Sequence, residues 1–142
     1  MFRKQLMVSA LMTTFMIGAV LMLTGCTAAV RNNRIEGKRF VYEKEGFPNE
    51  FSIRLDSDGS FTYYEGFFSS YVGTGSWQLD GDILTLRERD YSSVDGTVRN
   101  VYYFNVDDDG LSYISEGSDK FMFVDVSNGE RFIQNEKLTY YM

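Results

Sequence analysis

The residue types that carry most enzyme chemistry are scarce in this chain of 142 residues. It contains no His, which excludes a His-based catalytic triad, a His metal site and an imidazole general base. The single Cys excludes an intrachain disulfide and a Cys-based zinc or iron–sulfur site. Ser69 and Ser70 lie in no Ser-x-x-Lys pattern, and no spacing marks a carboxylate pair for glycoside hydrolysis. We therefore expect no enzyme activity and no cofactor.

Acidic turns are the next candidate, because Asp oxygens beside Gly can bind calcium. The turn at 56–59 is too short for an EF-hand loop, and no Glu follows at the twelfth position. A second acidic turn, at 107–110, consists of three Asp residues and a Gly. We interpret both as solvated hairpin turns and expect no metal site.

Cys26 has the clearest chemistry in the sequence. Two basic residues precede an uncharged run of 18 residues, Leu6 to Leu23, and Thr24-Gly25-Cys26 follows. A positive segment, an apolar run and small residues before a Cys resemble the signal peptide of bacterial lipoproteins. The resemblance implies removal of residues 1–25 and a diacylglycerol thioether on Cys26, which would anchor the chain to a membrane. An uncleaved transmembrane helix is the alternative, since such a run is at the lower limit for spanning a bilayer.

The charge of the remaining chain excludes another class of partner. There are 20 acidic and 14 basic residues, and only two basic residues precede Cys26, which leaves a formal charge of −8 from Cys26 onward. Nucleic-acid binding would need a basic surface instead. We assign residues 26–36 to the lipidated Cys and a flexible tether, 37–133 to one domain and 134–142 to a C-terminal tail.

Alternating apolar and polar residues predict that this domain is built from strands. The clearest alternation is Phe51 to Leu55, and no helical period is evident after Cys26. The other predicted strands lie around residues 40–42, 61–63, 77–79, 84–86, 101–106, 111–114, 121–124 and 132–133.

Turn residues separate these runs and predict hairpins at 56–59, 80–81, 107–110 and 127–129. The Asp80-Gly81 pair suits a type I′ turn. Eight or nine short strands joined by hairpins favour an all-β fold, a small antiparallel up-and-down barrel of about eight strands that is lipocalin-like. An immunoglobulin-like sandwich is the alternative.

Two segments carry a resemblance to known families. Residues 51–64, FSIRLDSDGSFTYY, and 73–86, GTGSWQLDGDILTL, resemble small lipocalin-like bacterial lipoproteins, a plan shared by the copper-homeostasis lipoprotein family and META-type domains. Residues 64–71 and 116–124 are more similar to a domain of clostridial and other Firmicutes proteins. That domain occurs as stand-alone lipoproteins and at the end of beta-lactam-sensor-like membrane metallopeptidases.

The resemblance implies a location more than an activity. It implies a Gram-positive cell and a domain on the outer, extracytoplasmic face of the cell membrane. The Cys-x-x-Cys of the copper family and the His residues of the peptidase motif are missing here, so neither activity is expected.

Aromatic residues supply the candidate binding site. Gly75-Ser76-Trp77 would place Trp77 as a plug at one end of a lipocalin-like barrel, or simply as a core residue with its N–H bonded nearby. The segment 66–72 is apolar and glycine-flanked, as binding loops often are. The candidate ligand-binding residues are Trp77, Phe61, Tyr63, Phe67, Phe68 and Tyr71.

Two functions remain open at this point. The first is a monomeric, membrane-tethered binding module that holds a small apolar or amphipathic molecule in its barrel. The second is a domain with a filled core that binds an envelope protein or glycan through exposed tyrosines.

Overall fold

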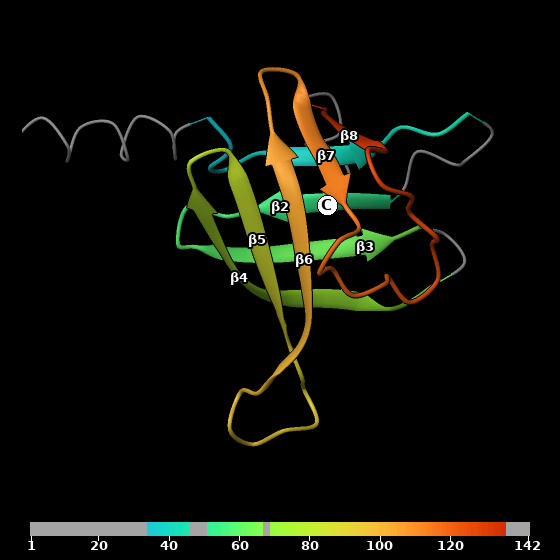
Figure 1. Ribbon diagram of the computed structural model, residues 1–142. Helices are drawn as coiled ribbons and strands as arrows, with labels where there is room; N and C mark the ends of the chain where they lie inside the picture. The colour runs from blue at the N-terminus through green and yellow to red at the C-terminus, as the bar shows by residue number, and fades with distance from the viewer. Residues whose placement is uncertain (1–33, 46–50, 67–68, 136–142) are drawn as a thin grey trace, which may run out of the picture. The chain divides into compact units, whose positions relative to one another are not determined.

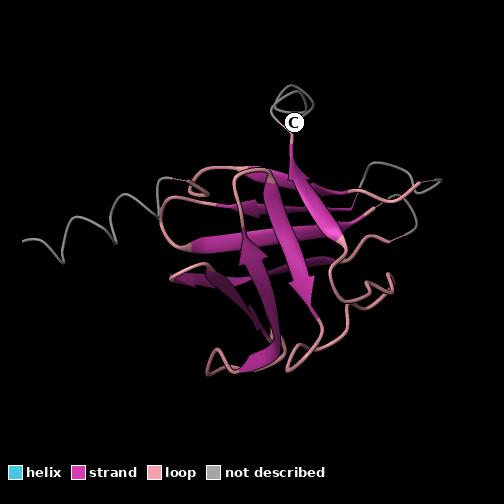
Figure 2. Cartoon of the chain, turned by 45° about the horizontal axis from the view of Figure 1, so that its top comes forward, coloured by secondary structure: helices cyan, strands magenta, loops and turns pink. Residues whose placement is uncertain are grey.

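The domain is a closed antiparallel β-barrel of eight strands in sequence order (Figure 1). The computed structural model describes residues 34–45, 51–66 and 69–135. Within that part the secondary structure is entirely strands and connections, which confirms the predicted all-β up-and-down barrel (Figure 2). The strands are β1 (Arg39–Tyr42), β2 (Phe51–Leu55), β3 (Ser60–Glu65), β4 (Val72–Asp80), β5 (Ile83–Arg89), β6 (Val98–Val106), β7 (Gly110–Ile114) and β8 (Arg131–Gln134).

The two ends of the barrel differ in the length of their connections. Three tight turns, at 56–59, 81–82 and 107–109, lie at one end, which we call the short-turn end. The connections 90–97 and 115–130 lie at the other, together with the described residues 43–45, 66 and 69–71, and we call this the long-loop end. The first strand runs from the short-turn end to the long-loop end, so the chain enters the barrel at the short-turn end.

The tight turns confirm three of the four predicted hairpins, with one difference in turn type. Gly81 has φ +62°, while no residue other than glycine has a positive φ among the described residues. A type I′ turn needs a positive φ at both central residues, and type II′ needs it only at the first. The turn between Asp80 and Ile83 therefore fits type II′, and the type I′ prediction was wrong.

The strand predicted at 121–124 does not form. A ninth strand would have no free sheet edge to pair with. Strand β8 pairs with β7 on one side and with β1 on the other, which closes the barrel with eight strands. Residues 115–130 instead form one irregular segment, which we call the strap. The turn at 127–129 lies within the last part of the strap, so it is not a hairpin between two strands.

One residue that precedes the first strand is part of the core. Ile35, which the sequence analysis assigned to the tether, is 2% exposed and belongs to the core. The backbone N–H of Gly37 donates to the carbonyl of Leu55 at 2.8 Å, which fixes this segment against the end of β2. Ile35 therefore closes the short-turn end of the interior.

Aromatic rings dominate that interior. The ring centroid of Phe132 in β8 lies 5.1 Å from that of Phe51 in β2 and 5.5 Å from that of Phe104 in β6, so the rings join opposite walls. An eight-stranded barrel is just wide enough for its own side chains to fill. The rings that share this buried cluster are those of Phe40, Tyr42, Phe51, Phe61, Tyr63, Tyr102, Phe104, Tyr113, Phe121 and Phe132.

Strand β4 depends on glycine where it lies closest to β5. A Cβ placed on Gly75 would lie 1.9 Å from the backbone oxygen of Arg87, which cannot move without breaking the β4–β5 ladder. A side chain at this position would therefore separate the two strands.

We predict that Gly75→Ala destabilises the domain by about 1–3 kcal/mol through this overlap. Urea unfolding of residues 27–142 measures the change. Ser76→Ala, at the exposed neighbouring position, is the control and should change the free energy of unfolding by less than about 0.5 kcal/mol. Equal effects of the two substitutions would contradict the prediction.

Candidate functional site

The strap crosses the mouth of the barrel at the long-loop end. Near its start the backbone N–H of Asp119 donates to the carbonyl of Val101 in β6 at 2.8 Å. A few residues later the strap reaches Glu65, the last residue of β3. Strands β4 and β5 lie between these two attachment points, so the strap passes over the interior.

Phe121 is the strap residue that enters the barrel. Phe121 is 6% exposed, and its ring stacks on that of Tyr102, with centroids 4.2 Å apart and planes 1° from parallel. Its centroid also lies 5.0 Å from that of Phe51 and 5.3 Å from that of Tyr63, both in edge-on geometry. These contacts place Phe121 as an aromatic plug in the mouth.

The carboxylate of Glu65 holds the strap through its backbone. The N–H groups of Met122, Phe123 and Val124 donate to it at 3.0, 2.6 and 2.9 Å. Burial raises the pKa of Glu65 above its usual value, and the nearby Glu88 adds to the increase, whereas the three N–H donors oppose it. The attachment therefore consists of an inward-facing acid and main-chain donors.

The far end of the strap is attached by a second carboxylate. Glu130 accepts a hydrogen bond at 2.5 Å from the hydroxyl of Tyr42 in β1 and one at 2.7 Å from the N–H of Ser127. Lys44 lies 3.2 Å from the same carboxylate. The strap is thus attached on both sides of the plug.

A second buried carboxylate, Glu88 in β5, organises the polar atoms beneath the strap. The Tyr102 hydroxyl donates to its Oε2 at 2.7 Å, and the Asn100 side-chain amide donates to the same oxygen at 2.9 Å. The Tyr71 hydroxyl donates to Oε1. Burial raises the pKa of the Tyr102 hydroxyl far above its usual range, so Tyr102 remains a donor at neutral pH. Glu88 therefore satisfies donors that the aromatic core would otherwise leave unpaired.

The structure separates the predicted binding residues into groups. Phe61 and Tyr63 are buried core residues. Tyr71 is half-buried at the long-loop end, where its ring contacts Tyr63 and the guanidinium of Arg99 lies 5.8 Å from its centroid. Phe67 and Phe68 lie outside the described residues.

Trp77 lies away from the long-loop end. It packs half-buried against the core, and its indole N–H donates to the carbonyl of Asp56 at 2.9 Å. Its own backbone N–H donates to Gly59 at 2.8 Å, in the turn between β2 and β3. Trp77 thus closes the short-turn end together with that turn, and the structure does not bring it together with Tyr71.

Sequence reasoning missed Glu65, Glu88 and Phe121. Two of them could have been found by extending the alternation that predicted the strands. Phe61, Tyr63 and Glu65 share the inward face of β3, and Leu84, Leu86 and Glu88 share that of β5. A carboxylate at an inward position of an apolar strand indicates a buried acid that needs donors.

The acidic turns carry local hydrogen bonds and ion pairs. Asp58 accepts from the N–H of Ser60, and Arg131 binds Asp107 through two nitrogens at 2.7 and 2.8 Å. Among the described residues there is no group of three or more Asp, Glu, His or Cys side chains placed to hold a metal ion.

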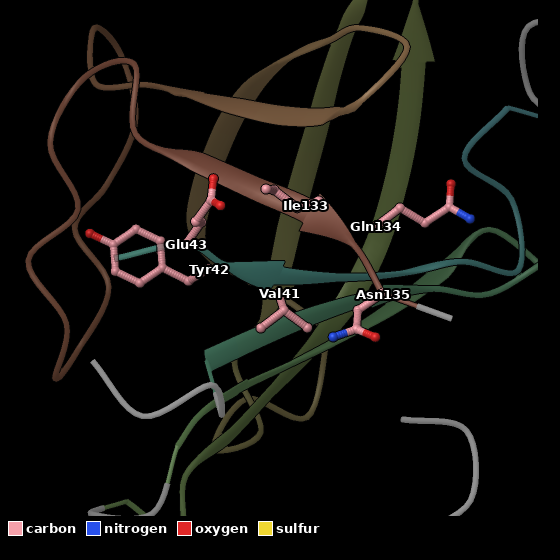
Figure 3. Close-up of a pocket in the computed structure, with 6 residues that line it drawn as sticks. All are labelled: Val41, Tyr42, Glu43, Ile133, Gln134 and Asn135. Carbon is pink, nitrogen blue, oxygen red and sulfur yellow. The ribbon is translucent and has the colours of Figure 1, made fainter. Parts of the chain in front are cut away.

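A hollow of about 210 Å³ lies on the seam between β1 and β8 (Figure 3). Val41 and Ile133, which pair across this seam, alternate with the inward-facing Tyr42 and Phe132, so the hollow is on the outer wall of the barrel. Tyr42 belongs both to its lining and to the aromatic interior. Its lining consists of Val41, Tyr42, Glu43, Ile133, Gln134 and Asn135.

The raised pKa of Glu65 predicts a pH dependence of stability. An acid with a higher pKa in the folded state binds its proton more tightly there, so its contribution favours folding at low pH and is lost as the pH rises through the folded value. We expect the native domain to lose stability relative to Glu65→Gln as the pH rises above about 4, the ordinary range of a glutamate pKa. Urea unfolding of both proteins over a series of pH values measures the difference. A constant difference, or one that grows in favour of Glu65, would contradict the expectation.

Comparisons of the chain with known protein families, with curated proteins and with solved structures found no match. In the part of the chain that the structure describes, no helix is long and apolar enough to cross a membrane.

Proposed function

We propose that this chain is a lipoprotein, anchored through Cys26 on the extracytoplasmic face of the membrane, whose barrel binds another component of the cell envelope with its outer surface. The lipobox-like segment before Cys26 supports the anchor. One structural observation supports the rest, which is that aromatic side chains of the described residues pack against one another across the interior of the barrel.

Several contacts support a filled interior. Aromatic side chains from opposite walls touch one another, and Phe121 occupies the mouth between Phe51, Tyr63 and Tyr102. No buried side-chain nitrogen or oxygen of the described residues lacks a hydrogen-bond partner, so no orphaned polar group marks the place of a polar ligand. A barrel with an interior packed in this way favours binding of a partner at its outer surface and its loops.

A carrier of a small apolar molecule is the second candidate function. The observation that favours it is that Phe121 comes from the strap and not from a strand, while its ring stacks on Tyr102 as the ring of an aromatic ligand would. Displacement of the strap would open a site lined by Phe51, Tyr63 and Tyr102. The two candidates differ in whether native protein holds a molecule inside.

Native mass spectrometry of residues 27–142 distinguishes them. We expect the mass of the polypeptide alone under native and denaturing conditions, and no binding of added toluene. Phe121→Ala is the positive control, because loss of the ring leaves an apolar cavity that a small aromatic molecule can enter. An extra mass that disappears on denaturation would contradict surface recognition and support the carrier.

The anchor has a separate test. We expect a chain expressed in a Gram-positive host to incorporate an alkyne-labelled fatty acid and to fractionate with membranes, because lipid chains on Cys26 provide stable attachment. Cys26→Ser should remain unlabelled. A native chain without label, or a labelled Cys26→Ser chain, would exclude lipidation at this residue.

A further inference from the structure

Exposed apolar side chains are distributed unevenly over the barrel. Seven large apolar residues of the described part are exposed, and six of them lie at the long-loop end. The seventh, Ile83, begins β5 at the short-turn end and is 40% exposed. We call the six residues together the apolar face, which is made up of separate segments, namely the start of β4, the β5–β6 connection with the start of β6, and the strap; they are Val72, Tyr91, Val94, Val98, Met122 and Phe123.

The β5–β6 connection presents part of this face on an ordered loop. Asp90 closes the loop, because its N–H donates to the carbonyl of Thr97 at 2.8 Å and its carboxylate accepts from the N–H of Ser92 at 2.9 Å. The Ser93 hydroxyl accepts from the N–H of Thr97 at 3.0 Å. Val94 at the tip is fully exposed, and the loop projects from the barrel in Figure 1. A loop ordered before binding loses little conformational entropy when a partner covers it.

The strap presents the other part. Phe121 points inward, while the adjacent Met122 and Phe123 are 44% and 60% exposed. Their backbone N–H groups are held by Glu65, so the exposed side chains have a fixed base. If a partner covered both side chains, their apolar surface would be removed from water, which would stabilise the complex.

The charge around the apolar face is negative. Residues 43–45, 65, 88–99 and 115–130 contain ten acidic and four basic side chains. The two buried acids at this end, Glu65 and Glu88, accept from main-chain N–H groups, tyrosine hydroxyls and an amide, none of which is charged. An apolar surface within a negative field favours a partner with cationic groups around an apolar centre.

The same charge argues against two other occupants. A second copy of this chain would bring like charges together, and an anionic lipid surface would repel the face. The first strand, β1, also begins at the short-turn end, opposite the apolar face.

We propose that the apolar face binds a segment of another protein in which apolar side chains are flanked by Lys or Arg. This inference rests on the proposed function, and it adds the surface and the chemistry of the partner. Val94 and Phe123 are the residues that the partner covers, and the acidic residues around them select its charge.

Selection from a random-peptide display library against the full chain, solubilised in a neutral detergent, tests the proposal. We expect enriched peptides to combine apolar residues with Lys or Arg, and their binding to weaken as salt is added. Phe123→Ser and Val94→Ser should each weaken binding about tenfold or more. Ile83→Ser, which alters an exposed apolar residue at the other end, is the matched control and should leave binding unchanged.

The outcomes separate this proposal from the function on which it rests. Enrichment of acidic peptides, no enrichment, or equal binding to the native chain and to Phe123→Ser and Val94→Ser would overturn the assignment of the face. Because both side chains are exposed, we expect the variants to fold, and thermal melting of each variant checks this. A small molecule found inside the native barrel would instead overturn the proposed function.

Discussion

The closed mouth of this barrel depends on one carboxylate. In a sheet, each backbone N–H finds its acceptor on a neighbouring strand, but the closed barrel leaves no free edge for residues 121–124. Glu65 supplies the missing acceptor for three consecutive residues. Since buried N–H groups without acceptors cost free energy, the strap can lie across the mouth only where such an acid faces inward. The position of Phe121 follows from that attachment.

Glu88 has a related role for the side chains. A core built from tyrosines brings hydroxyl groups into the interior along with the rings, and each hydroxyl needs a partner. A carboxyl group has two oxygens that accept hydrogen bonds, so it can serve several donors at once. Glu88 does so for Tyr71 and Tyr102 and for the Asn100 amide. The polar network and the aromatic packing are therefore parts of one core.

Sequence alternation predicted most of this fold, because alternation and turn residues act locally. The runs around β2, β3 and β5 and the three tight turns lie where the patterns placed them. The predictions that failed concern features that depend on residues distant in the sequence. Residues 121–124 have the composition of a strand, yet whether a strand forms depends on a free edge elsewhere in the barrel. Ile35 lies in a polar stretch. Its burial depends on the open end of the barrel, which is formed by residues that are distant in the sequence.

The candidate site was less predictable for the same reason. The inward positions of Glu65 and Glu88 follow from the period of their strands. The identity of their donors does not, because Met122 to Val124 are far from Glu65 in sequence. Trp77 and Tyr71, close in sequence, lie at different ends of the barrel because β4 is long.

The attachment of the strap through main-chain N–H groups has an evolutionary consequence. Every residue except proline offers the same N–H, so the side chains at Met122 and Phe123 can be replaced without loss of the hydrogen bonds to Glu65. Substitutions there would alter the outer surface while the plug and the interior stay in place. Descendants of this chain could thus diverge in what they recognise at little cost to folding, with Glu65 and Phe121 as the positions that selection must keep.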